Sequence, residues 1–519
     1  MNSMSPNVIV YAFIVSLGGF VFGFDASVIS GTVGFITTEF SLDAWQQGMV
    51  VSAPSLGALV AMFFAGRFSD KFGRKTVLQW VAILYLISAI TSALAVNFYM
   101  LAVARLLGGL AFCSLMVAPL YIAEISQATH RGKLVSINQF NIVIGLSASY
   151  FTNYWLLNLS QTPESWLLSL SAPQDVWRWM LGLEIIPALL WCILLFTIVE
   201  TPRWLVTQHR EKDAKRALQA LGEKDASAML TSIKASLGEK TLSLKAQLSL
   251  IISPKLRLPL LIGLVIGIVQ QLTGINVIFF YAPTIFEQSG IGTDAAFVQA
   301  IGVGLTNVIF TIVAILAIDR FGRKPLLVIG LSGIIFSMSL CAYGFKQATY
   351  TLDAQNVAQI VAQTELEPAA FAPLVDKTFT HDVDFKQALQ AALGEQTALN
   401  NEGVILQQAT QLNPTLILVG IIMFVACFAM SLGPVMWVLF SEIFPNSVRG
   451  VAISVVTVFN SLCSFLVQFI FPWELANYGA AFTFMSYAVV ALIGLVFVLK
   501  YLPETKGLDL EALSERLAK

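Results

Sequence analysis

Long runs of apolar residues, separated by short polar segments, dominate the pattern of this 519-residue chain. A helix that crosses about 30 Å of hydrocarbon needs about 20 mostly apolar residues. Six such runs cover roughly 8–30, 48–66, 76–96, 98–122, 134–157 and 177–199. Six more cover roughly 258–286, 296–318, 325–345, 414–440, 450–471 and 480–502. Because backbone polar groups in lipid must be bonded internally, these runs predict an all-α membrane protein with twelve transmembrane helices.

Short motifs recur between the two sets, which predicts two related six-helix halves. The sequence Asp-Lys-Phe-Gly-Arg-Lys at 70–75 returns as Asp-Arg-Phe-Gly-Arg-Lys at 319–324, 249 residues later. Glu-Ile at 124–125 returns at 442–443, 318 residues later. The second offset is longer by 69 residues, which is about the length of the polar stretch 346–413. We therefore interpret 346–413 as an insertion in the second half.

The predicted organisation follows from these boundaries. It comprises an N-terminal six-helix bundle (1–199), a linker with short helices (200–257), a C-terminal six-helix bundle (258–503) that includes the insertion, and a tail (504–519). Two parallel six-helix halves are an architecture of transporters, in which the substrate site lies at the repeat interface.

The distribution of charge orients the predicted helices. Only 12% of the residues are charged and 57% are hydrophobic, which argues against a water-soluble enzyme. The net charge of −1 hides a split: 200–257 holds 11 Lys or Arg and 6 acids, whereas 346–413 holds 3 Lys and 8 acids. We expect the protein to lie in the cell (inner) membrane. The positive-inside rule then places the linker and both termini in the cytoplasm, and the insertion on the outer side of the membrane.

Signals for other chemistry are weak in this sequence. The five cysteines lie in apolar runs without metal-ligand spacing, and the three histidines lie in loops. The sequence contains no glycine-rich phosphate loop and no nucleophile–base pair. We therefore expect no cofactor, no metal, no catalytic residue and no nucleic-acid partner, and a monomer in the lipid bilayer.

Three ionisable residues lie deep in the predicted spans: Asp25, Arg105 and Glu184. A charge at such depth costs several kcal/mol (about 2.5–3.5 on insertion scales) unless it is paired or neutralised, so each is a functional candidate. One interpretation is a permanent Asp25–Arg105 bridge that holds two helices together. The other is a switch, in which Asp25 stays ionised beside Arg105 and binds a proton when it is separated from it.

Five amides also lie in apolar runs: Gln139, Gln270, Gln271, Asn276 and Asn460. Hydrogen bonding between helices is their simplest role. Sugar binding is the alternative, because an amide offers donors and an acceptor, as the hydroxyls of a sugar do. Two aromatic residues, Phe22 and Trp437, would then supply apolar faces for the sugar ring.

Matched acids and arginines stand at the predicted cytoplasmic ends of the helices in both halves. Ion pairs among them would close the cytoplasmic side in one state and open in the other. The candidate residues for this gate are Asp70, Arg74, Glu124, Arg131, Glu200, Arg203, Asp319, Arg323, Glu442, Arg449 and Glu504.

Several motifs together resemble the sugar porter family of the major facilitator superfamily, and its bacterial xylose–proton symporters most. They are Gly66 with 70–75, Arg105-Leu-Leu-Gly-Gly109, Pro119-Leu-Tyr-Ile-Ala-Glu124, Arg131-Gly132, Glu200-Thr-Pro-Arg203, Gln270-Gln-Leu-Thr-Gly-Ile-Asn276, Gly433-Pro-Val-Met-Trp437, Glu442-Ile-Phe-Pro445 and Pro503-Glu-Thr-Lys-Gly507. They run in family order over nearly the whole chain except 346–413.

This resemblance implies the major facilitator fold and a proton-coupled symporter that imports a monosaccharide by alternating access. The sugar is a pentose or hexose such as xylose, glucose or galactose. The resemblance also implies that Asp25 is the proton site, that Arg105 is its switchable partner and that Glu184 is a supporting carboxylate. It also assigns sugar contacts to the five amides, to Trp437 and Phe22, and to Gly433.

Three departures from the family pattern put xylose itself in doubt. Leu146 stands where the xylose symporters have a second Gln, Ser461 stands where a Trp is common, and Phe280 replaces the first Tyr of a Tyr-Tyr pair. A passive sugar uniporter with a structural Asp25–Arg105 bridge is the alternative function. A non-transporting sugar sensor is a further one, although such proteins usually carry long tails.

Overall fold

The structure is a computed structural model of the whole chain. It describes residues 5–127, 130–223, 225–237, 244–364, 366–445 and 448–506. Within these ranges it does not describe the side chains of Arg131, Ser236, Leu237, Leu244 and Asp319. The chain divides into two compact units. The N-terminal unit is Met1–Ser27, Ala53–Ser149 and Arg178–Gln247, and the C-terminal unit is Val28–Ser52, Tyr150–Trp177 and Leu248–Lys519.

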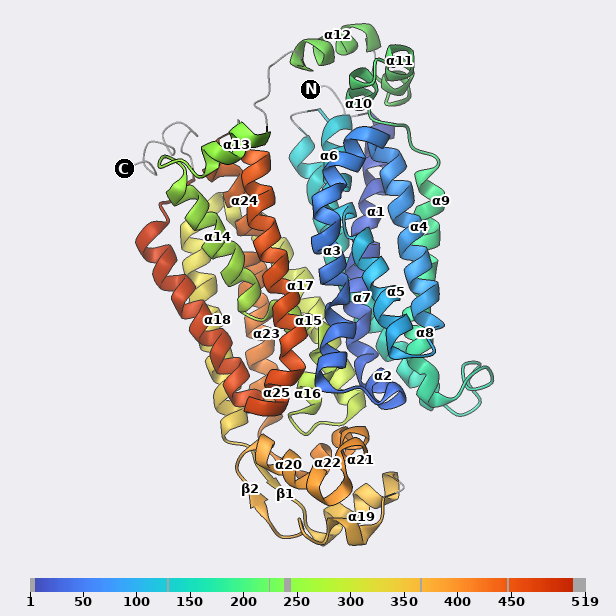
Figure 1. The fold of residues 1–519 in the computed structure, drawn as a ribbon, viewed down its shortest axis with the longest axis vertical. Coiled ribbons are helices and arrows are strands. Elements are labelled where there is room, and N and C mark those ends of the chain that lie inside the picture. Colours follow the sequence, from blue (N-terminus) through green and yellow to red (C-terminus); the bar gives the residue numbers. More distant parts are fainter. Residues whose placement is uncertain are drawn as a thin grey trace. The chain divides into compact units, whose positions relative to one another are not determined.

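Helices build the first half of the chain (Figure 1). They are α1 (Pro6–Val28), η1 (Ile29–Gly31), α2 (Val33–Phe40), α3 (Ala44–Phe72), α4 (Arg74–Ala93), α5 (Phe98–Ala111), α6 (Ser114–Ile125), α7 (Arg131–Gln161), η2 (Pro173–Asp175), α8 (Val176–Gly182) and α9 (Ile185–Leu195). The linker forms α10 (Pro202–Thr207), α11 (Glu211–Ala220), α12 (Ala226–Leu237) and α13 (Leu244–Ile251). Trp204, Leu205, Val206, Ala214 and Ala217 form a small core under α10–α12.

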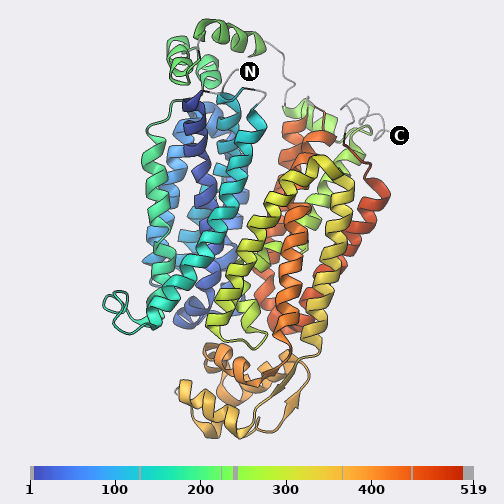
Figure 2. The same cartoon turned by 180° about the vertical axis from the view of Figure 1, so that it is seen from behind.

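The second half is helical in the same way, as Figure 2 shows from behind. Outside the insertion its helices are α14 (Arg257–Leu272), α15 (Ile275–Phe280), α16 (Ala282–Glu287), α17 (Thr293–Phe321), α18 (Arg323–Lys346), α23 (Pro414–Met430), α24 (Leu432–Ile443) and α25 (Arg449–Tyr501). The insertion contains β1 (Thr349–Thr351), α19 (Ala354–Gln363), η3 (Pro368–Phe371), β2 (Thr378–Phe379), α20 (Asp382–Leu393), α21 (Glu395–Asn400), α22 (Glu402–Ala409) and β3 (Thr410–Gln411).

Eleven helical segments of the described chain are long and apolar enough to cross a membrane. The last, α25, merges the final two predicted spans, and Gly479 (φ 79°) interrupts its helical geometry between them. The prediction of twelve spans is therefore confirmed. Other spans contain breaks at positions the hydrophobic pattern does not reveal, at Gly274 between α14 and α15 and at Ser431, which is followed by Gly433-Pro434.

The outer faces of the spans are as apolar as their buried faces. In α18, Leu327, Leu331 and Ile334 are fully buried, whereas Ile329, Phe336 and Tyr343 are more than half exposed. An exposed apolar stripe of this kind is unusual in a soluble monomer, because water does not solvate it well. It fits a helix that packs on one side and faces lipid on the other.

The insertion is a small domain with its own hydrophobic core. Buried side chains that include Tyr350, Phe371, Phe385 and Ile405 form this core. The three short strands pair antiparallel in the order β2-β1-β3, with Tyr350 opposite Phe379 and Thr349 opposite Gln411. The sequence predicts helices here but not this sheet, because two- and three-residue strands leave no readable alternation.

Candidate functional site

A buried ion pair lies in the N-terminal unit, between α1 and α5. The Arg105 guanidinium bonds Asp25 Oδ1 through Nη1, and its Nη2 donates to the Asp25 carbonyl at 3.2 Å. Asp25 is 0% exposed and Arg105 1% exposed. Asn97 caps the start of α5, accepting from the Met100 N–H at 2.9 Å, which sets Arg105 two turns into the helix.

This ion pair is incompletely satisfied. Asp25 Oδ2, Arg105 Nε and Glu184 Oε1 are buried and have no hydrogen-bond partner among the described residues. A methyl group added at Gly108 would lie 3.0 Å from Asp25 Oδ2 and 2.6 Å from Ser88 Oγ, so the glycine permits this close approach. Glu184 is 2% exposed and is near enough to interact electrostatically with both members of the pair. The three ionisable residues predicted at depth therefore meet in one place.

An amide network occupies the interior of the C-terminal unit. Asn460 on α25 donates to Gln270 Oε1 and to the Gly267 carbonyl, both at 2.8 Å. Gln271 Nε2 donates to Asn460 Oδ1 at 3.3 Å and to Gln270 Oε1 at 3.2 Å. Asn276 Nδ2 donates to Gln271 Oε1 at 2.8 Å. The structure thus joins four of the five predicted amides, which come from α14, α15 and α25.

The sequence pattern did not predict two members of this network, Ser464 and Gln468. Ser464 Oγ accepts from Asn276 Nδ2 and from Gln468 Nε2, each at 2.8 Å. Ser464 and Gln468 follow Asn460 at intervals of four, so all three lie on one face of α25. That spacing is the signal in the sequence that would have found them.

The other predicted sugar contacts lie apart from this network. Trp437 on α24 is 44% exposed and packs edge-on against Phe440 at 6.0 Å between ring centroids. Gly433 lies at the start of the same helix. In the N-terminal unit, Gln139 on α7 is exposed, and Phe22 on α1 packs edge-on against Phe112 at 4.5 Å.

The three departures from the family pattern also have defined surroundings. Leu146 is 6% exposed on α7, Ser461 is 8% exposed on α25, and Phe280 is partly buried at the end of α15. Next to Phe280, Tyr281 uses its hydroxyl to donate to the Gln468 carbonyl at 3.1 Å. The retained tyrosine therefore fixes the backbone of α25 close to the amide network.

The motif at 70–75 forms a compact acid–arginine cluster in the N-terminal unit. Arg74 pairs with Glu124 at 3.0 Å and with Asp70 at 3.1 Å. Glu200 accepts from the backbone N–H groups of Arg74 and Lys75, each at 3.1 Å, and so caps the start of α4. A carboxylate at a helix N-terminus bonds unpaired N–H groups and is favoured by the helix dipole.

The C-terminal unit repeats this cluster. Arg323 pairs with Glu442 at 2.7 Å, and Glu504 accepts from the N–H groups of Arg323 and Lys324 at 3.0 Å each. Thr201 and Thr505 complete the match, each donating to the paired glutamate at 2.6 Å. Gly73 (φ 96°) and Gly322 (φ 91°) form the turns before the capped helices, and a side chain there would strike Glu200 or Glu504.

Two of the predicted gate residues, Arg203 and Arg449, do not pair with an acid within the described residues, and the structure does not test two others. The side chains of Arg131 and Asp319 lie outside the described part of the structure. Arg203 is exposed, and no acid within the described ranges pairs with it. Arg449 donates through Nε to the Phe444 carbonyl at 3.1 Å, and its buried Nη2 has no partner among the described residues.

The two capping glutamates differ in their ionisation. Burial raises the pKa of Glu200, and this effect outweighs the hydrogen bonds from the N–H groups of Thr201, Lys75 and Arg74. Burial acts in the same direction on Glu504, but backbone hydrogen bonds from residues that include Lys506 and Arg323 outweigh it and lower its pKa. The same cap is thus more strongly desolvated in the N-terminal unit.

Comparisons with known proteins agree with this architecture. The family model described as "Sugar (and other) transporter" matches residues 11–366 and 396–517. The chain is similar to the arabinose–proton symporter of Bacillus subtilis (strain 168), 31% identical over 512 residues, 98% of this chain and 94% of that protein. It is similar to the D-xylose–proton symporter of Escherichia coli (strain K12), 31% identical over 536 residues, 96% of this chain and 94% of that protein.

A solved structure shows the same fold. The partially occluded, inward-open conformation of the xylose transporter XylE from E. coli superposes with a TM-score of 0.71 at 29% identity, covering 97% of this chain and 100% of that chain. Within the described residues, no group of three or more His, Cys, Asp or Glu side chains is placed to hold a metal ion. This chain belongs to the sugar porter family of the major facilitator superfamily, and it is a multi-pass membrane protein that transports sugar rather than an enzyme.

Proposed function

We propose that this protein is a proton-coupled symporter that imports a monosaccharide by alternating access. One observation carries the proton coupling: the buried Asp25–Arg105 pair, in which Asp25 Oδ2 has no hydrogen-bond partner among the described residues. The names of the relatives, an arabinose–proton and a xylose–proton symporter, support a monosaccharide of the pentose class, and the proposal also includes hexoses.

The chemistry of the pair suits a switch with two states. Beside Arg105, the negative charge of Asp25 is compensated by the guanidinium. When a conformational change separates the two groups, an ionised carboxylate in this buried place is costly, and binding a proton neutralises it. Glu184 supports the switch by adding a second carboxyl group beside Arg105. Proton binding is thereby linked to the conformation of the transporter.

The amides of the C-terminal unit bind the sugar in this proposal. Gln270, Gln271, Asn276 and Asn460 already form mutual hydrogen bonds at 2.8–3.3 Å, so each presents donors and acceptors with fixed directions. Sugar hydroxyls replace some of these bonds without leaving polar groups unpaired. Trp437, Gly433, Phe22 and Gln139 keep the sugar-contacting roles that the family resemblance implies.

The two acid–arginine clusters act as the cytoplasmic gate. Each cluster ties the start of one span to a glutamate from another segment, Glu200 in one unit and Glu504 in the other. The loop charges favour an orientation with both termini in the cytoplasm of a cell (inner) membrane and the insertion outside. The predicted halves 1–199 and 258–503 remain the proposed domains, and the proposed oligomeric state is a monomer.

Uptake into proteoliposomes tests this function. The purified protein is reconstituted, an inward proton gradient is imposed, and uptake of labelled D-xylose, D-glucose and L-arabinose is followed with and without a protonophore. A symporter accumulates one of these sugars above its external concentration only while the gradient lasts. Equal internal and external concentrations under a maintained gradient would instead show a uniporter with a structural Asp25–Arg105 bridge. Competition with unlabelled pentoses and hexoses at two pH values then identifies the preferred sugar.

A further inference from the structure

The insertion is held against the end of α16 by a largely buried cluster of polar side chains. Lys386 on α20 pairs with Glu402 on α22 at 2.7 Å and donates to Gln288 Oε1 at 2.8 Å. Gln288 follows α16 and donates back to Glu402 at 3.1 Å. The Lys386 and Glu402 side chains are only 13% and 24% exposed, so the three groups form a closed and largely desolvated ring of bonds.

A second contact fixes the other side of the insertion. Asp382, at the start of α20, accepts from the backbone N–H of Ala480 at 3.0 Å. Ala480 follows Gly479, the point where α25 bends. Two separate attachments, to the end of α16 and to the bend of α25, hold the insertion in one position on this unit. A surface held in this way is preorganised for binding a ligand.

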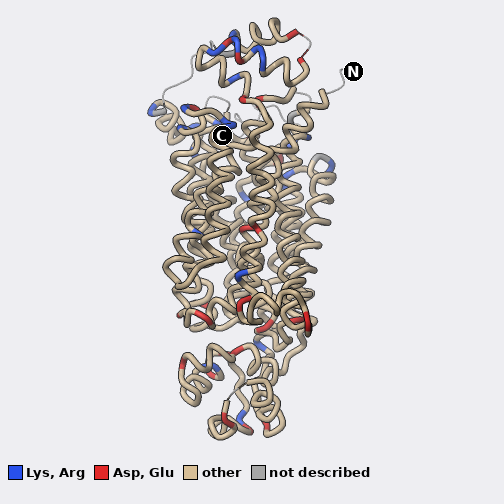
Figure 3. The backbone as a smooth tube through the Cα atoms, turned by 90° about the vertical axis from the view of Figure 1, so that its right-hand side faces the viewer, with Lys and Arg blue, Asp and Glu red and all other residues tan. Residues whose placement is uncertain are grey.

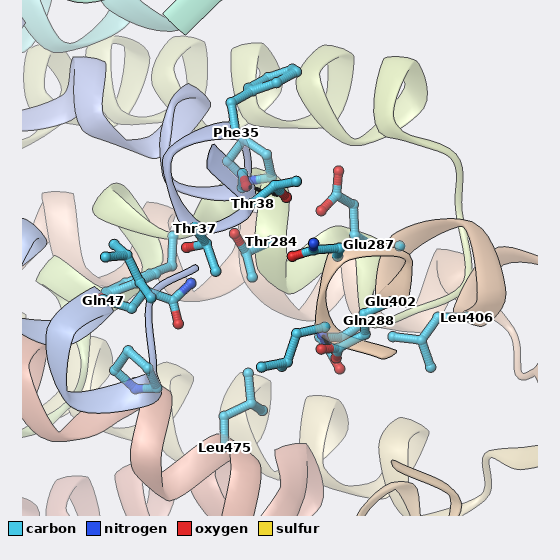
Figure 4. A pocket seen from close by; sticks show the side chains of 18 of the residues that line it. Phe35, Thr37, Thr38, Gln47, Thr284, Glu287, Gln288, Glu402, Leu406 and Leu475 are labelled. Carbon is cyan, nitrogen blue, oxygen red and sulfur yellow. Dashed lines mark hydrogen bonds between the residues drawn. The ribbon is translucent and has the colours of Figure 1, made fainter. Parts of the chain in front are cut away.

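The docked insertion closes one wall of a cavity of about 720 Å³. The residues that line this cavity belong to the C-terminal unit, and Figure 4 shows the side chains of 18 of them. Its volume lies in the range of about 300–1,000 Å³ that is usual for small-molecule sites. The other walls come from η1, α2, the start of α3, η2, α16, the start of α17 and α25. The cavity is separate from the amide network, since none of Gln270, Gln271, Asn276 and Asn460 lines it.

The lining combines neutral polar groups with aromatic rings. Amides and hydroxyls line the cavity from α2, α3, α16 and the insertion, and they include Thr37, Gln47, Thr284, Gln288 and Gln390, whereas α25 contributes only apolar residues. Aromatic side chains also contribute: Phe35, Tyr281, Phe297 and Phe471. Groups that both donate and accept, beside apolar ring faces, match the two kinds of surface that a sugar ring presents.

Some of these polar groups lack a protein partner. Thr37 Oγ1 is buried and has no hydrogen-bond partner among the described residues. Gln47 on α3 and Gln390 on α20 also line the cavity; they are partly buried, and the described part of the chain provides no hydrogen bond to either side chain. Buried polar atoms are normally bonded, so the unbonded Thr37 Oγ1 at this cavity indicates a polar ligand or water, and the two amides are available to the same ligand.

Charge narrows the class of ligand. Four acids line the cavity, Glu39, Asp175, Glu287 and Glu402, against a single lysine, Lys386, which is already paired with Glu402. Anionic ligands such as sugar acids and sugar phosphates are therefore repelled. Neutral ligands with many hydroxyl groups are not.

We propose that this cavity is a second sugar site, which binds a neutral mono- or disaccharide between the insertion and α16. The inference rests on the proposed function, because a second sugar site is useful only to a protein that transports sugar. The cavity is lined by α16, which directly follows α14 and α15 in the chain, and these two helices carry amides of the proposed transport site. Sugar held here raises the local concentration available for transport. The site is weaker than the amide network, since it offers separate polar groups rather than a continuous network.

The test separates the two sites by substitution. One variant carries Gln47→Leu and Gln390→Leu in the cavity, a second carries Asn460→Ala in the amide network, and the matched control Gln161→Leu alters an exposed amide of the same unit outside the cavity. Binding of D-xylose, D-glucose and D-glucuronate to the full-length protein in nanodiscs is followed by saturation-transfer NMR. Proteoliposome uptake gives KM and kcat for the same proteins.

The cavity variant should lose the weak binding component that Asn460→Ala retains. Its uptake KM should rise about fivefold to tenfold with kcat unchanged, while Gln161→Leu should match the wild type. D-glucuronate should give no signal. Loss of all sugar binding in Asn460→Ala, or an unchanged KM in a folded cavity variant, would overturn the second site and leave the transport proposal intact. Absence of gradient-driven uptake in the wild type would instead overturn the proposed function, whatever the binding data show.

Discussion

The two units share the structure of their acid–arginine clusters, which the repeated motifs form, and differ in their interiors. Arg74 with Glu124 and Glu200 has the same arrangement as Arg323 with Glu442 and Glu504, including the capped helix and the threonine hydrogen bond. In the interior, the N-terminal unit holds charged residues with unbonded atoms, whereas the C-terminal unit holds neutral amides that bond one another.

This difference separates two physical tasks. An unsatisfied buried charge responds strongly to a change in its surroundings, which suits proton binding. A neutral network with donors and acceptors in every member can exchange partners at little cost, which suits a sugar. The repeated clusters have the same structure in both units, and the differing interiors would carry the two proposed functions, proton binding and sugar binding. Figure 3 shows a second asymmetry, with acidic residues gathered at the insertion and its adjoining end of the spans.

The largest expected effect concerns the charged interior of the N-terminal unit. Asp25→Asn removes the proposed proton site, so gradient-driven accumulation should disappear while sugar counterflow continues. A pH difference of about two units can sustain about 100-fold accumulation with one proton per sugar, and the variant should reach a ratio of about one. Asp225→Asn, an exposed aspartate of the linker, is the control. Accumulation by Asp25→Asn at the wild-type level would refute the role of Asp25.

The next effect compares the two repeated clusters. Side-chain exposure is 10% for Arg74 and 7% for Glu124, against 12% for Arg323 and 24% for Glu442. Removing one partner of a buried ion pair costs about 3 kcal/mol, because the other charge stays buried without compensation. Arg74→Ala should therefore lower the apparent Tm in detergent more than Arg323→Ala does. Equal shifts in Tm would show that the extra burial of the first cluster has no energetic consequence.

A third effect concerns the neutral interior of the C-terminal unit. Asn460→Ala removes one donor from Gln270 Oε1, which keeps only Gln271 Nε2, removes the side-chain donor of the Gly267 carbonyl, and removes a proposed sugar contact. A lost buried hydrogen bond weakens the binding free energy by about 1–3 kcal/mol. The dissociation constant for sugar should therefore rise about tenfold or more. Asn477→Ala, an exposed asparagine further along α25, serves as the matched control. Equilibrium binding in nanodiscs measures both, and an unchanged constant for Asn460→Ala would move the sugar site elsewhere.

The smallest effect concerns an acid outside both interiors. Burial raises the pKa of Glu287 to about 7; the charge of Glu402 acts in the same direction, and a hydrogen bond with Thr293 opposes it. Because the pKa of Glu287 in the folded protein exceeds its ordinary value, the protonated group stabilises the fold around the insertion below about pH 4.5, and this contribution is lost as pH rises from about 4.5 to about 7. The insertion should therefore exchange its amide hydrogens faster at high pH than at low pH, after correction for intrinsic rates.

Glu287→Gln sharpens the comparison between the units. The variant should lose the pH dependence of exchange in α20–α22 and keep full proton-driven accumulation, because the proposed proton site lies in the N-terminal unit. The effect is small since Glu287 is only partly buried and borders the cavity. Loss of accumulation in this variant would place a coupling carboxylate in the C-terminal unit.

Much of the fold was predictable because the membrane imposes a simple pattern. Length and hydropathy located the spans, and Gly479 separates the last two within the predicted gap 471–480. Motif spacing also predicted that Arg74 and Arg323 pair with acids. The main role of Glu200 and Glu504 was not predicted, since each bonds backbone N–H groups at a helix start, and a sequence motif does not reveal a cap supplied from more than 100 residues away.

The hydrophobic pattern alone identifies the residues that are chemically unusual for their position: two carboxylates, a guanidinium and several amides inside apolar spans. It does so because the pattern is local and each exception to it is visible at once. The folded arrangement was needed to show which of these residues meet, such as Asn276 with Ser464, and that the insertion closes a cavity against α16 through Lys386 and Gln288. Such contacts depend on the rotation and packing of helices far apart in the chain, which no local pattern encodes.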